Sequence, residues 1–399
     1  MSAPLQGIRV LELARILAGP WAGQLLADLG ADVVKVERSK TGDDTRAWGP
    51  PFVEGADGSN LGAGYYHSCN RGKRGVVADF ETPEGQKIVR QLAAHADVLI
   101  ENFKFGGLKK YGLDYDNLKQ INPKLIYCSI TGFGQNGPYA PRPGYDFLVQ
   151  GMGGLMSITG PIEGPPYKAG VAVGDIFTGL YSTIAIEAAL VRRERTGEGA
   201  FIDCCLIDSV VGILGNQALY YLVSGKEPPR MGNAHATVIP YDVFKASDGD
   251  FIIASGNDGQ YKRLMQLLGR AELAEDPRFR ENKDRIANRV ELTPILNELT
   301  SKFTRADLIE KLEAAGVPAG PINTLSEVFA DPQVIARGMR IDPVNPRAKG
   351  GTTPGLRTPI VLDGAPAASA RASPGLGEHT QDVLSDPAWG GNSSQARAG

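Results

Sequence analysis

Strand-length apolar stretches that alternate with helical patterns are the feature that most constrains the fold of this chain. The stretches are rich in β-branched residues and lie at Ile8–Leu13, Asp32–Glu37, Gly75–Phe80, Asp97–Ile100 and Leu125–Ile130. Helical patterns fall between several of them, at Ala22–Leu29 and at Thr82–Ala94, where Thr82 is placed to cap the helix and Pro83 to be its first residue. Alternating strands and helices favour parallel βαβ units, so we expect an α/β domain with a doubly wound parallel sheet.

The pattern changes in the second half of the chain. A long apolar helix is predicted from about Ile176 to Val191, with the basic run 192–195 at its C-terminal end. Beyond residue 229, Asp248-Gly-Asp separates two short strands and predicts a hairpin, and further helices are expected at Gln260–Leu268 and Arg305–Ala315. A hairpin followed by helices is typical of a second, smaller α+β domain.

These observations give a domain plan for the 399 residues, a length that suits two domains at roughly 100–200 residues each. The segment after about residue 331 is rich in Pro, Gly and Ala and needs a surface on which to pack. We therefore expect a large domain (1–200), a linker (201–229), a small α+β domain (230–325), and a return segment (326–399) that packs on the large domain.

Charge and hydropathy exclude several partners. Lys and Arg number 42 against 45 Asp and Glu, so the formal net charge of −3 offers no basic field for nucleic acid. No apolar run reaches the ~20 residues that span a bilayer, and the first residues lack the pattern of a secretory signal. The sequence predicts a cytoplasmic protein with neither a nucleic-acid nor a membrane partner.

Metal and nucleotide cofactors are also not expected. The cysteines (Cys69, Cys128, Cys204 and Cys205) form no Cys-x-x-Cys pair, and the four histidines are scattered along the chain. The loop after the first predicted strand, Ala14–Pro20, lacks Gly-x-Gly-x-x-Gly, which argues against NAD binding. No Gly-x-x-x-x-Gly-Lys-Ser/Thr phosphate loop is present either.

Asp175 is the candidate for chemistry. It lies between a short apolar strand and the long helix, in the segment Ala169–Gly179. One interpretation is an N-cap aspartate, because Asp is a preferred cap. The other is a carboxylate held ionised by the helix N-terminus and able to act as a nucleophile. Spacing alone leaves both interpretations open.

A set of ordered motifs identifies a family. The chain closely resembles the class III CoA-transferases, the CaiB/BaiF family that includes formyl-CoA transferase, from Leu5 to about Leu384. The motifs that carry this resemblance are Gly7–Leu13, Ala18–Pro20, Leu25–Arg38, Gly42–Arg46, Asn70–Arg74, Glu101–Phe103, Gly132–Gly134, Val173–Asp175 and Leu376–Thr380.

The resemblance implies a Rossmann-like large domain built from both chain ends, a small inserted domain, and two subunits interlocked as a homodimer. It places the nucleophile at Asp175 and makes coenzyme A, as an acyl-CoA, the substrate. The carboxylate attacks the donor thioester to give a mixed anhydride, and the released CoA thiolate then converts the anhydride to an aspartyl-CoA thioester. An acceptor carboxylate reverses the sequence.

The resemblance also points to CoA contacts. The matching positions are Arg38, Asn102 and Phe103, with Lys110 and Arg142 at or next to phosphate contacts; for Arg38 and Lys110 an ordinary surface charge is the alternative. Asn102-Phe103 follows a predicted strand, at the end where α/β proteins bind ligands. Two departures, Leu17 in place of Gln and Glu81 in place of Lys, argue against formate or oxalate as the acid.

Further residues are expected near the substrate. Tyr145 and Asp146 follow the Gly-Phe-Gly motif, and Gly256, Asn257, Asp258 and Gly259 match the family's glycine loop, for which a plain turn is the alternative. His235 precedes this segment and is not assigned to catalysis. The family also includes α-methylacyl-CoA racemases, which carry Gly-His-Asp where this chain has Gly144-Tyr-Asp146. Tyrosine, with an ordinary pKa near 10, is a poor substitute for that base.

Together with the resemblance, the sequence predicts a CoA-transferase that moves CoA from a donor such as succinyl-CoA to a small dicarboxylic acid. A racemase and a non-catalytic CoA-binding protein are the alternatives. A second carboxylate in a closed site needs a cation, because an unpaired charge there costs several kcal/mol. Arg46 and the cluster Arg71, Lys73 and Arg74 are candidates for that cation; for each of them, solvated surface or a CoA phosphate contact is the alternative.

Overall fold

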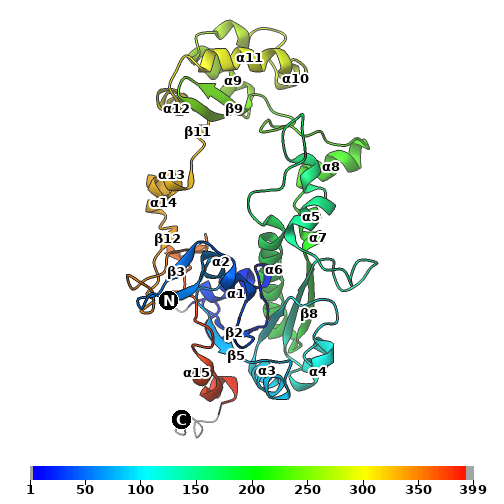
Figure 1. Cartoon of the computed structure of the whole chain (residues 1–399). Coiled ribbons are helices and arrows are strands. Elements are labelled where there is room, and N and C mark those ends of the chain that lie inside the picture. The colour runs from blue at the N-terminus through cyan, green and yellow to red at the C-terminus, as the bar shows by residue number, and fades with distance from the viewer. Residues whose placement is uncertain (1–2, 392–399) are drawn as a thin grey trace. The chain divides into compact units, whose positions relative to one another are not determined.

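The computed structural model describes residues 3–391 and divides into two compact units (Figure 1). Within the described residues, the first unit comprises 3–156, 168–225 and 335–391, and the second comprises 157–167 and 226–334. Each unit has its own hydrophobic core and is described by itself.

A six-stranded sheet with only parallel pairings organises the first unit, in the order β5-β2-β1-β6-β7-β8. The chain runs from β1 outward through β2 to β5, and then returns to place β6 on the other side of β1. The order therefore reverses between β1 and β6, the point at which open α/β sheets bind ligands. The strands are β1 (Arg9–Glu12), β2 (Asp32–Glu37), β5 (Arg74–Val77), β6 (Val98–Glu101), β7 (Ile126–Thr131) and β8 (Ala200–Cys205).

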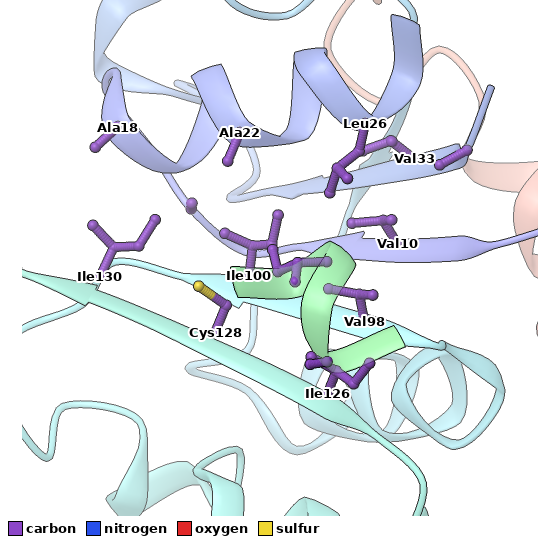
Figure 2. Close-up of a cluster of buried hydrophobic side chains, with 14 of the residues drawn as sticks. Val10, Ala18, Ala22, Leu26, Val33, Val98, Ile100, Ile126, Cys128 and Ile130 are labelled. Atoms are coloured by element: carbon purple, nitrogen blue, oxygen red, sulfur yellow. The ribbon is translucent and has the colours of Figure 1, made fainter. Parts of the chain in front are cut away.

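Both faces of this sheet are covered by helices, because alternate residues of a strand point to opposite faces. Val10 and Ile100 face the helices α1 (Ala18–Asp28) and α6 (Val173–Thr196). Figure 2 shows Ala18, Ala22 and Leu26 of α1 directed toward these strands. The predicted α/β sheet is thus confirmed.

The opposite face of the sheet carries a second apolar cluster. Leu11 and Leu99 pack there against α3 (Pro83–His95) and α4 (Tyr115–Ile121). The C-terminal region contributes two fully buried side chains to this cluster, Val383 of α15 (Thr380–Ser385) and Trp389. The Trp389 indole also donates a hydrogen bond to Asp32 of β2, at 2.8 Å.

Local sequence signals explain the helix ends. Thr82 caps α3 by accepting a hydrogen bond from the Gly85 amide, and Pro83 is the first helical residue, as predicted. The helix α6 begins at Val173, earlier than expected, and Gly179 lets it lie directly against α1. A Cβ at Gly179 would lie 2.7 Å from the Ala18 carbonyl oxygen, so a larger residue would separate the two helices.

Helix α6 is long and apolar enough to cross a membrane by length and composition, and 44% of its most apolar window is buried within the unit. The helices α7 (Leu206–Gly212) and α8 (Gly215–Ser224), which meet at a bend of 74°, pass the same criterion as a pair. Core helices of soluble proteins also meet this criterion, so it is weak evidence for a membrane span. The cytoplasmic location stays a prediction.

The second unit contains an antiparallel sheet in the order β11-β10-β9. The hairpin of β9 (Tyr241–Ala246) and β10 (Gly249–Ala254) turns at Asp248, as the sequence predicts, and β11 (Ala319–Pro321) pairs with β10. The sheet packs against helices through an apolar core that includes Phe244 and Phe251. The helices of this unit are α9 (Asp258–Leu267), α10 (Asn282–Ala287), α11 (Arg289–Thr300), α12 (Arg305–Ala314) and α13 (Leu325–Ala330), with α14 (Pro332–Ala336) at its boundary.

Residues 200–205 differ from the expected domain plan, which placed the linker at 201–229. They form β8, paired with β7 over its whole length, and α7 (Leu206–Gly212) and α8 (Gly215–Ser224) follow within the first unit. The strand was missed because polar Asp203 interrupts its apolar residues. The remaining elements are β3 (Phe52–Glu54), β4 (Asn60–Ala63), α2 (Gly64–Ser68), α5 (Asp146–Met152), β12 (Arg340–Ile341), β13 (Gly355–Leu356), β14 (Val361–Leu362) and β15 (Ala365–Pro366).

Candidate active site

A cavity of about 640 Å³ lies in the first unit where the strand order reverses. Residues that follow β1, β6 and β7 line it, so it occupies the carboxyl ends of the central strands. The cavity brings together six of the residues singled out in the sequence: Asn102, Phe103, Lys110, Arg142, Tyr145 and Asp175.

Asn102 connects the end of β6 to the loop that follows β1, the two strands between which the strand order reverses. Its side-chain oxygen accepts a hydrogen bond from the Arg15 amide at 2.8 Å, and its Nδ2 donates to the Arg15 carbonyl at 2.6 Å. The side chain thus satisfies both backbone groups of Arg15, which lies in the loop that follows β1. Asn102 therefore holds the loop that begins at Ala14 against the end of β6.

Phe103 offers an aromatic wall beside Asn102. Its ring contacts Phe80 edge-on, with the ring centroids 5.4 Å apart, and the guanidinium carbon of Arg15 lies 5.4 Å from the Phe103 centroid. The Phe103 amide donates to the buried carboxylate of Glu101 at 2.8 Å. Burial raises the pKa of Glu101 to about 7, and its hydrogen bonds from Ser129 and Phe103 only partly oppose this.

Asp175 is the third residue of α6, so the interpretation of this side chain as an N-cap is wrong. Asp146 instead serves the start of the helix, because its Oδ1 accepts a hydrogen bond from the Gly174 amide at 2.8 Å. Gln150 donates to the other oxygen of Asp146 at 2.7 Å. With Asp146 satisfying the helix terminus, Asp175 lines the cavity.

The electrostatics of Asp175 differ from those of an ordinary aspartate. Burial raises its pKa to about 7, and the negative charge of Asp146 adds to this effect. The carboxylate is thus poorly solvated and faces a second carboxylate. Poor solvation favours attack by a carboxylate, since less water must be removed from its oxygens.

Arg142 and Tyr145 reach the cavity on a loop that lies close over the end of β7. A Cβ at Gly132 would lie 2.5 Å from the Gly144 Cα, so this approach requires glycine. The Arg142 guanidinium stacks on Tyr139, 3.9 Å from the ring centroid, and makes no ion pair within residues 3–391. Its charge is available to an anion in the cavity.

The other two predicted CoA cations differ in their surroundings. Lys110 lines the cavity, with its Nζ 4.5 Å from the centroid of the Tyr111 ring. Arg38 does not line the cavity; its guanidinium bonds the Gly42 carbonyl and the carboxylate of Asp44, which does. Of the two positions that depart from formyl-CoA transferases, Glu81 lines the cavity and Leu17 is buried.

The cations proposed for a second substrate carboxylate are already paired. Arg46 holds both oxygens of Glu37 at 2.7 Å and stacks on Tyr66, which leaves this largely buried side chain no free charge to offer. The cluster Arg71, Lys73 and Arg74 is also ion-paired within the protein. Arg71 pairs with Asp28, Lys73 with Glu12, and Arg74 with Asp32. These contacts give the residues structural roles and correct the expectation from sequence.

The predicted glycine loop lies in the second unit. Asn257 caps α9 by accepting from the Gln260 amide, and Asp258 pairs with the buried guanidinium of Arg285 at 2.7 Å. Gly256 and Gly259 flank these two residues. His235 is in the same unit, with its ring against Tyr241. Roles for these residues at the active site stay predictions.

Sequence reasoning missed several residues of the cavity wall. Arg15 and Ile16 follow β1 and Trp48 lies beyond β2, positions that would have identified them once the strand order was known. Tyr65 packs edge-on against Trp48 at 5.4 Å, and burial raises its pKa, with the charge of Asp175 as the next cause. In the described part of the chain, no group of three or more His, Cys, Asp or Glu side chains is arranged to hold a metal ion.

Comparisons with known proteins identify the family of the chain. The model of CoA-transferase family III matches residues 5–380. The chain is 58% identical to succinate–glutarate CoA-transferase of Agrobacterium fabrum, over 96% of this chain and 95% of the relative. It is 42% identical to the human succinyl-CoA:glutarate CoA-transferase, over 96% of this chain and 86% of the relative.

A solved structure shows the same architecture. The crystal structure of a CAIB/BAIF family protein from Brucella suis superimposes with a TM-score of 0.86 at 58% identity, covering 96% of this chain and 99% of that one. The resemblance inferred from the motifs is confirmed by this structure and by the family match. The chain is a member of CoA-transferase family III.

Proposed function

We propose that the enzyme transfers CoA from succinyl-CoA to a four- or five-carbon dicarboxylic acid, with Asp175 as the nucleophile. The observation that carries the proposal is the position of Asp175, a poorly solvated carboxylate in the same cavity as Asn102 and Phe103. The relatives support the substrate class, because they are named for succinyl-CoA or succinate together with glutarate.

The proposed chemistry requires a poorly solvated carboxylate that attacks a thioester. A carboxylate oxygen of Asp175 forms a bond to the acyl carbon of the donor, and the carbon–sulfur bond breaks to release the CoA thiolate. The thiolate then attacks the Asp175 carbonyl of the anhydride, which releases the donor as a free carboxylate and leaves Asp175 bonded to CoA. The acceptor carboxylate repeats both steps in reverse, so no net proton or electron is needed.

The acid substrate carries a carboxylate that does not react, and this charge needs a partner in the cavity. Arg46 and the cluster Arg71, Lys73 and Arg74 are committed to carboxylates of the protein itself. The cationic side chains that line the cavity are Arg15, Lys104, Lys110 and Arg142. These residues replace Arg46 as candidates for the positive environment that favours a dicarboxylate.

The racemase alternative receives no support from the site. Racemisation needs a base of suitable pKa to remove the α-proton of the acyl group. The position where racemases have histidine holds Tyr145, which lines the cavity with an exposed side chain. A phenol is a poorer general base for this step than the imidazole that it replaces.

We propose that the protein assembles as an interlocked homodimer. In each subunit, two chain connections join the second unit to the first. The second unit is entered and left through chain that belongs to the first. Two helices of the first unit expose apolar side chains that a partner subunit would bury. These side chains are Leu180, Tyr181, Ile184 and Val191 of α6, and Leu219, Tyr220, Tyr221, Leu222 and Val223 of α8.

Replacing the nucleophile tests the mechanism. The Asp175→Asn side chain has the same shape but cannot attack as a carboxylate, so CoA transfer should fall by at least ~10³-fold. Transfer would be measured with purified enzyme and chromatographic detection of both thioesters. Circular dichroism must show an unchanged fold, and near-normal transfer by this variant would refute the role of Asp175.

The ionisation of Asp175 predicts the pH dependence. Because the attacking form is the ionised one and its pKa is about 7, kcat/KM should rise as the pH increases through 7 and level off above it. Asp146→Asn keeps an oxygen for the Gly174 amide but removes a negative charge, so the midpoint should move to lower pH. The matched control, Asp382→Asn on the exposed side of α15, should leave it in place. An unmoved midpoint in Asp146→Asn would contradict the coupling.

Acceptor preference tests the substrate class. With succinyl-CoA as donor, dicarboxylic acids should exceed monocarboxylic acids of equal carbon number by about tenfold or more in kcat/KM, since only they satisfy the cations of the cavity. Glutarate against valerate is a suitable pair, since each would give a thioester distinct from the donor. A preference for the monocarboxylic acids would rule out the proposed substrate class.

Dilution tests the assembly. Subunits that are interlocked cannot separate without unfolding, so the molecular mass should remain that of a dimer down to nanomolar protein. Mass photometry or light scattering measures this directly. A folded monomer that circular dichroism cannot distinguish from the concentrated protein would exclude an interlocked dimer.

A further inference from the structure

The first unit contains a second cavity, of about 370 Å³, next to the one that Asp175 lines. The two cavities share three residues of the loop after β6, which are Lys104, Phe105 and Gly107. None of the catalytic or CoA-contact residues expected from the sequence lines the second cavity. Its volume is within the range of sites that bind small organic molecules.

Strand pairing gives the second cavity a polar floor. Glu101 of β6 and Ser129 of β7 are paired neighbours in the parallel sheet, so their side chains lie on the same face. Gln135 donates to the Ser129 hydroxyl oxygen at 2.9 Å, which leaves the hydroxyl hydrogen for the Glu101 carboxylate. The Phe103 amide donates to the same carboxylate at 2.8 Å. Two donors that converge on Glu101 favour its ionised form.

The Glu101 carboxylate lacks a positive partner. The residue is only 5% exposed, and it forms no ion pair within residues 3–391. Burial therefore raises its pKa to about 7, although both hydrogen bonds act in the opposite direction. A buried carboxylate without a counter-charge is costly, so a cation that entered the cavity would form a favourable charge-assisted hydrogen bond.

Three aromatic rings form a wall of the same cavity. Tyr127 and Phe201 are paired across β7 and β8, and their ring centroids lie 5.9 Å apart. The ring of Tyr115, the first residue of α4, lies 5.2 Å from that of Phe201. The Tyr127 hydroxyl already donates to the Leu113 carbonyl, so this residue offers its ring to a ligand. Aromatic rings attract organic cations as well as apolar groups.

The other charged side chains around the cavity do not supply the missing cation. They are Lys104, Lys109, Asp114 and Asp116. Two lysines balance two aspartates, so the net charge of the lining is that of Glu101. Both lysines are exposed and screened by water, whereas the Glu101 carboxylate is buried. The interior of the cavity is therefore negative and suited to a cation.

We propose that the second cavity binds a small organic ammonium ion. The N–H groups of the ligand bond the Glu101 carboxylate, and its apolar part lies against the rings of Tyr127 and Phe201. The site does not depend on the proposed role of Asp175, because Asp175 lines the other cavity.

The experiment measures the binding of benzylamine, an ammonium ion with one aromatic ring, to the full-length protein. Saturation-transfer NMR titrations at about pH 8 keep Glu101 mostly ionised and benzylamine protonated. For a ligand of this size we expect a Kd in the millimolar range. Benzyl alcohol has the same ring without the charge, and it should bind at least ~tenfold more weakly, as for loss of one charge-assisted hydrogen bond.

A matched pair of variants locates the ligand. Glu101→Gln keeps an oxygen for the Phe103 amide but removes the charge, so the affinity for benzylamine should fall by about tenfold or more. Asp175→Asn makes the same chemical change in the other cavity and should leave this affinity unchanged. Thermal denaturation of each variant checks that the fold is retained.

A second pair tests the aromatic wall and does not alter a buried residue. Phe201→Ala removes one ring at a position that is 42% exposed, and it should weaken the binding of both benzylamine and benzyl alcohol severalfold. The control Phe329→Ala removes a phenylalanine of the second unit that is 41% exposed, and it should leave both affinities unchanged. This pair keeps the proposal testable if Glu101→Gln fails to fold.

Three results would overturn the proposal. Absence of benzylamine binding at tens of millimolar would mean that the cavity does not accept a free ligand. Equal affinities for benzylamine and benzyl alcohol would remove the role of the charge. A loss of affinity in Asp175→Asn but not in Glu101→Gln would place the ligand in the other cavity. The titrations contain no CoA and measure no transfer, so their outcome is independent of the test of the proposed function.

Discussion

A buried group of charges beneath the cavity loop is the interaction on which the site depends. Lys35 and Lys73 share the carboxylate of Glu12, and Lys35 also pairs with Asp43 at 2.9 Å, with all four side chains almost fully buried. Burial alone would lower the pKa of Lys35, but the charges of Asp43 and Glu12 raise it. For Lys73, burial outweighs the charge of Glu12, and its pKa is lowered. Removing one member of such a group would cost about 3–5 kcal/mol, because the others would remain buried without a partner.

This group of charges acts on function through backbone atoms. Lys35 donates to the Ala14 carbonyl, and Lys73 donates to the Pro20 carbonyl in the first turn of α1 at 2.9 Å, so the two ammonium groups hold the loop after β1 and the start of the helix that follows it. The ends of a loop on a parallel sheet have backbone groups that no strand or helix satisfies. Here buried cations satisfy them, which leaves the outer surface of the loop for the ligand.

Much of this arrangement could be predicted from sequence, and the reasons are local. Alternating strand and helix patterns predicted the parallel sheet, and Thr82-Pro83 predicted the start of α3, because each depends on nearby residues. The position of Asn102 at a strand end was likewise correct. The role of Arg46 was wrong because its pairing with Glu37 and Tyr66 depends on tertiary contacts that spacing does not reveal. The strand β8 was missed because polar Asp203 interrupts its apolar residues, so that only its pairing with β7 reveals it.

The buried C-terminal region has a consequence for the order of folding. Val383 and Trp389 fill the same apolar cluster as Leu11 and Leu99, although nearly the whole chain lies between them. During synthesis, that face of the central sheet stays incomplete until residue 389 has left the ribosome, whereas the second unit is already fully translated by then. The smaller unit is thus free to fold before the first unit, whose cavity-bearing sheet is completed only by these later residues.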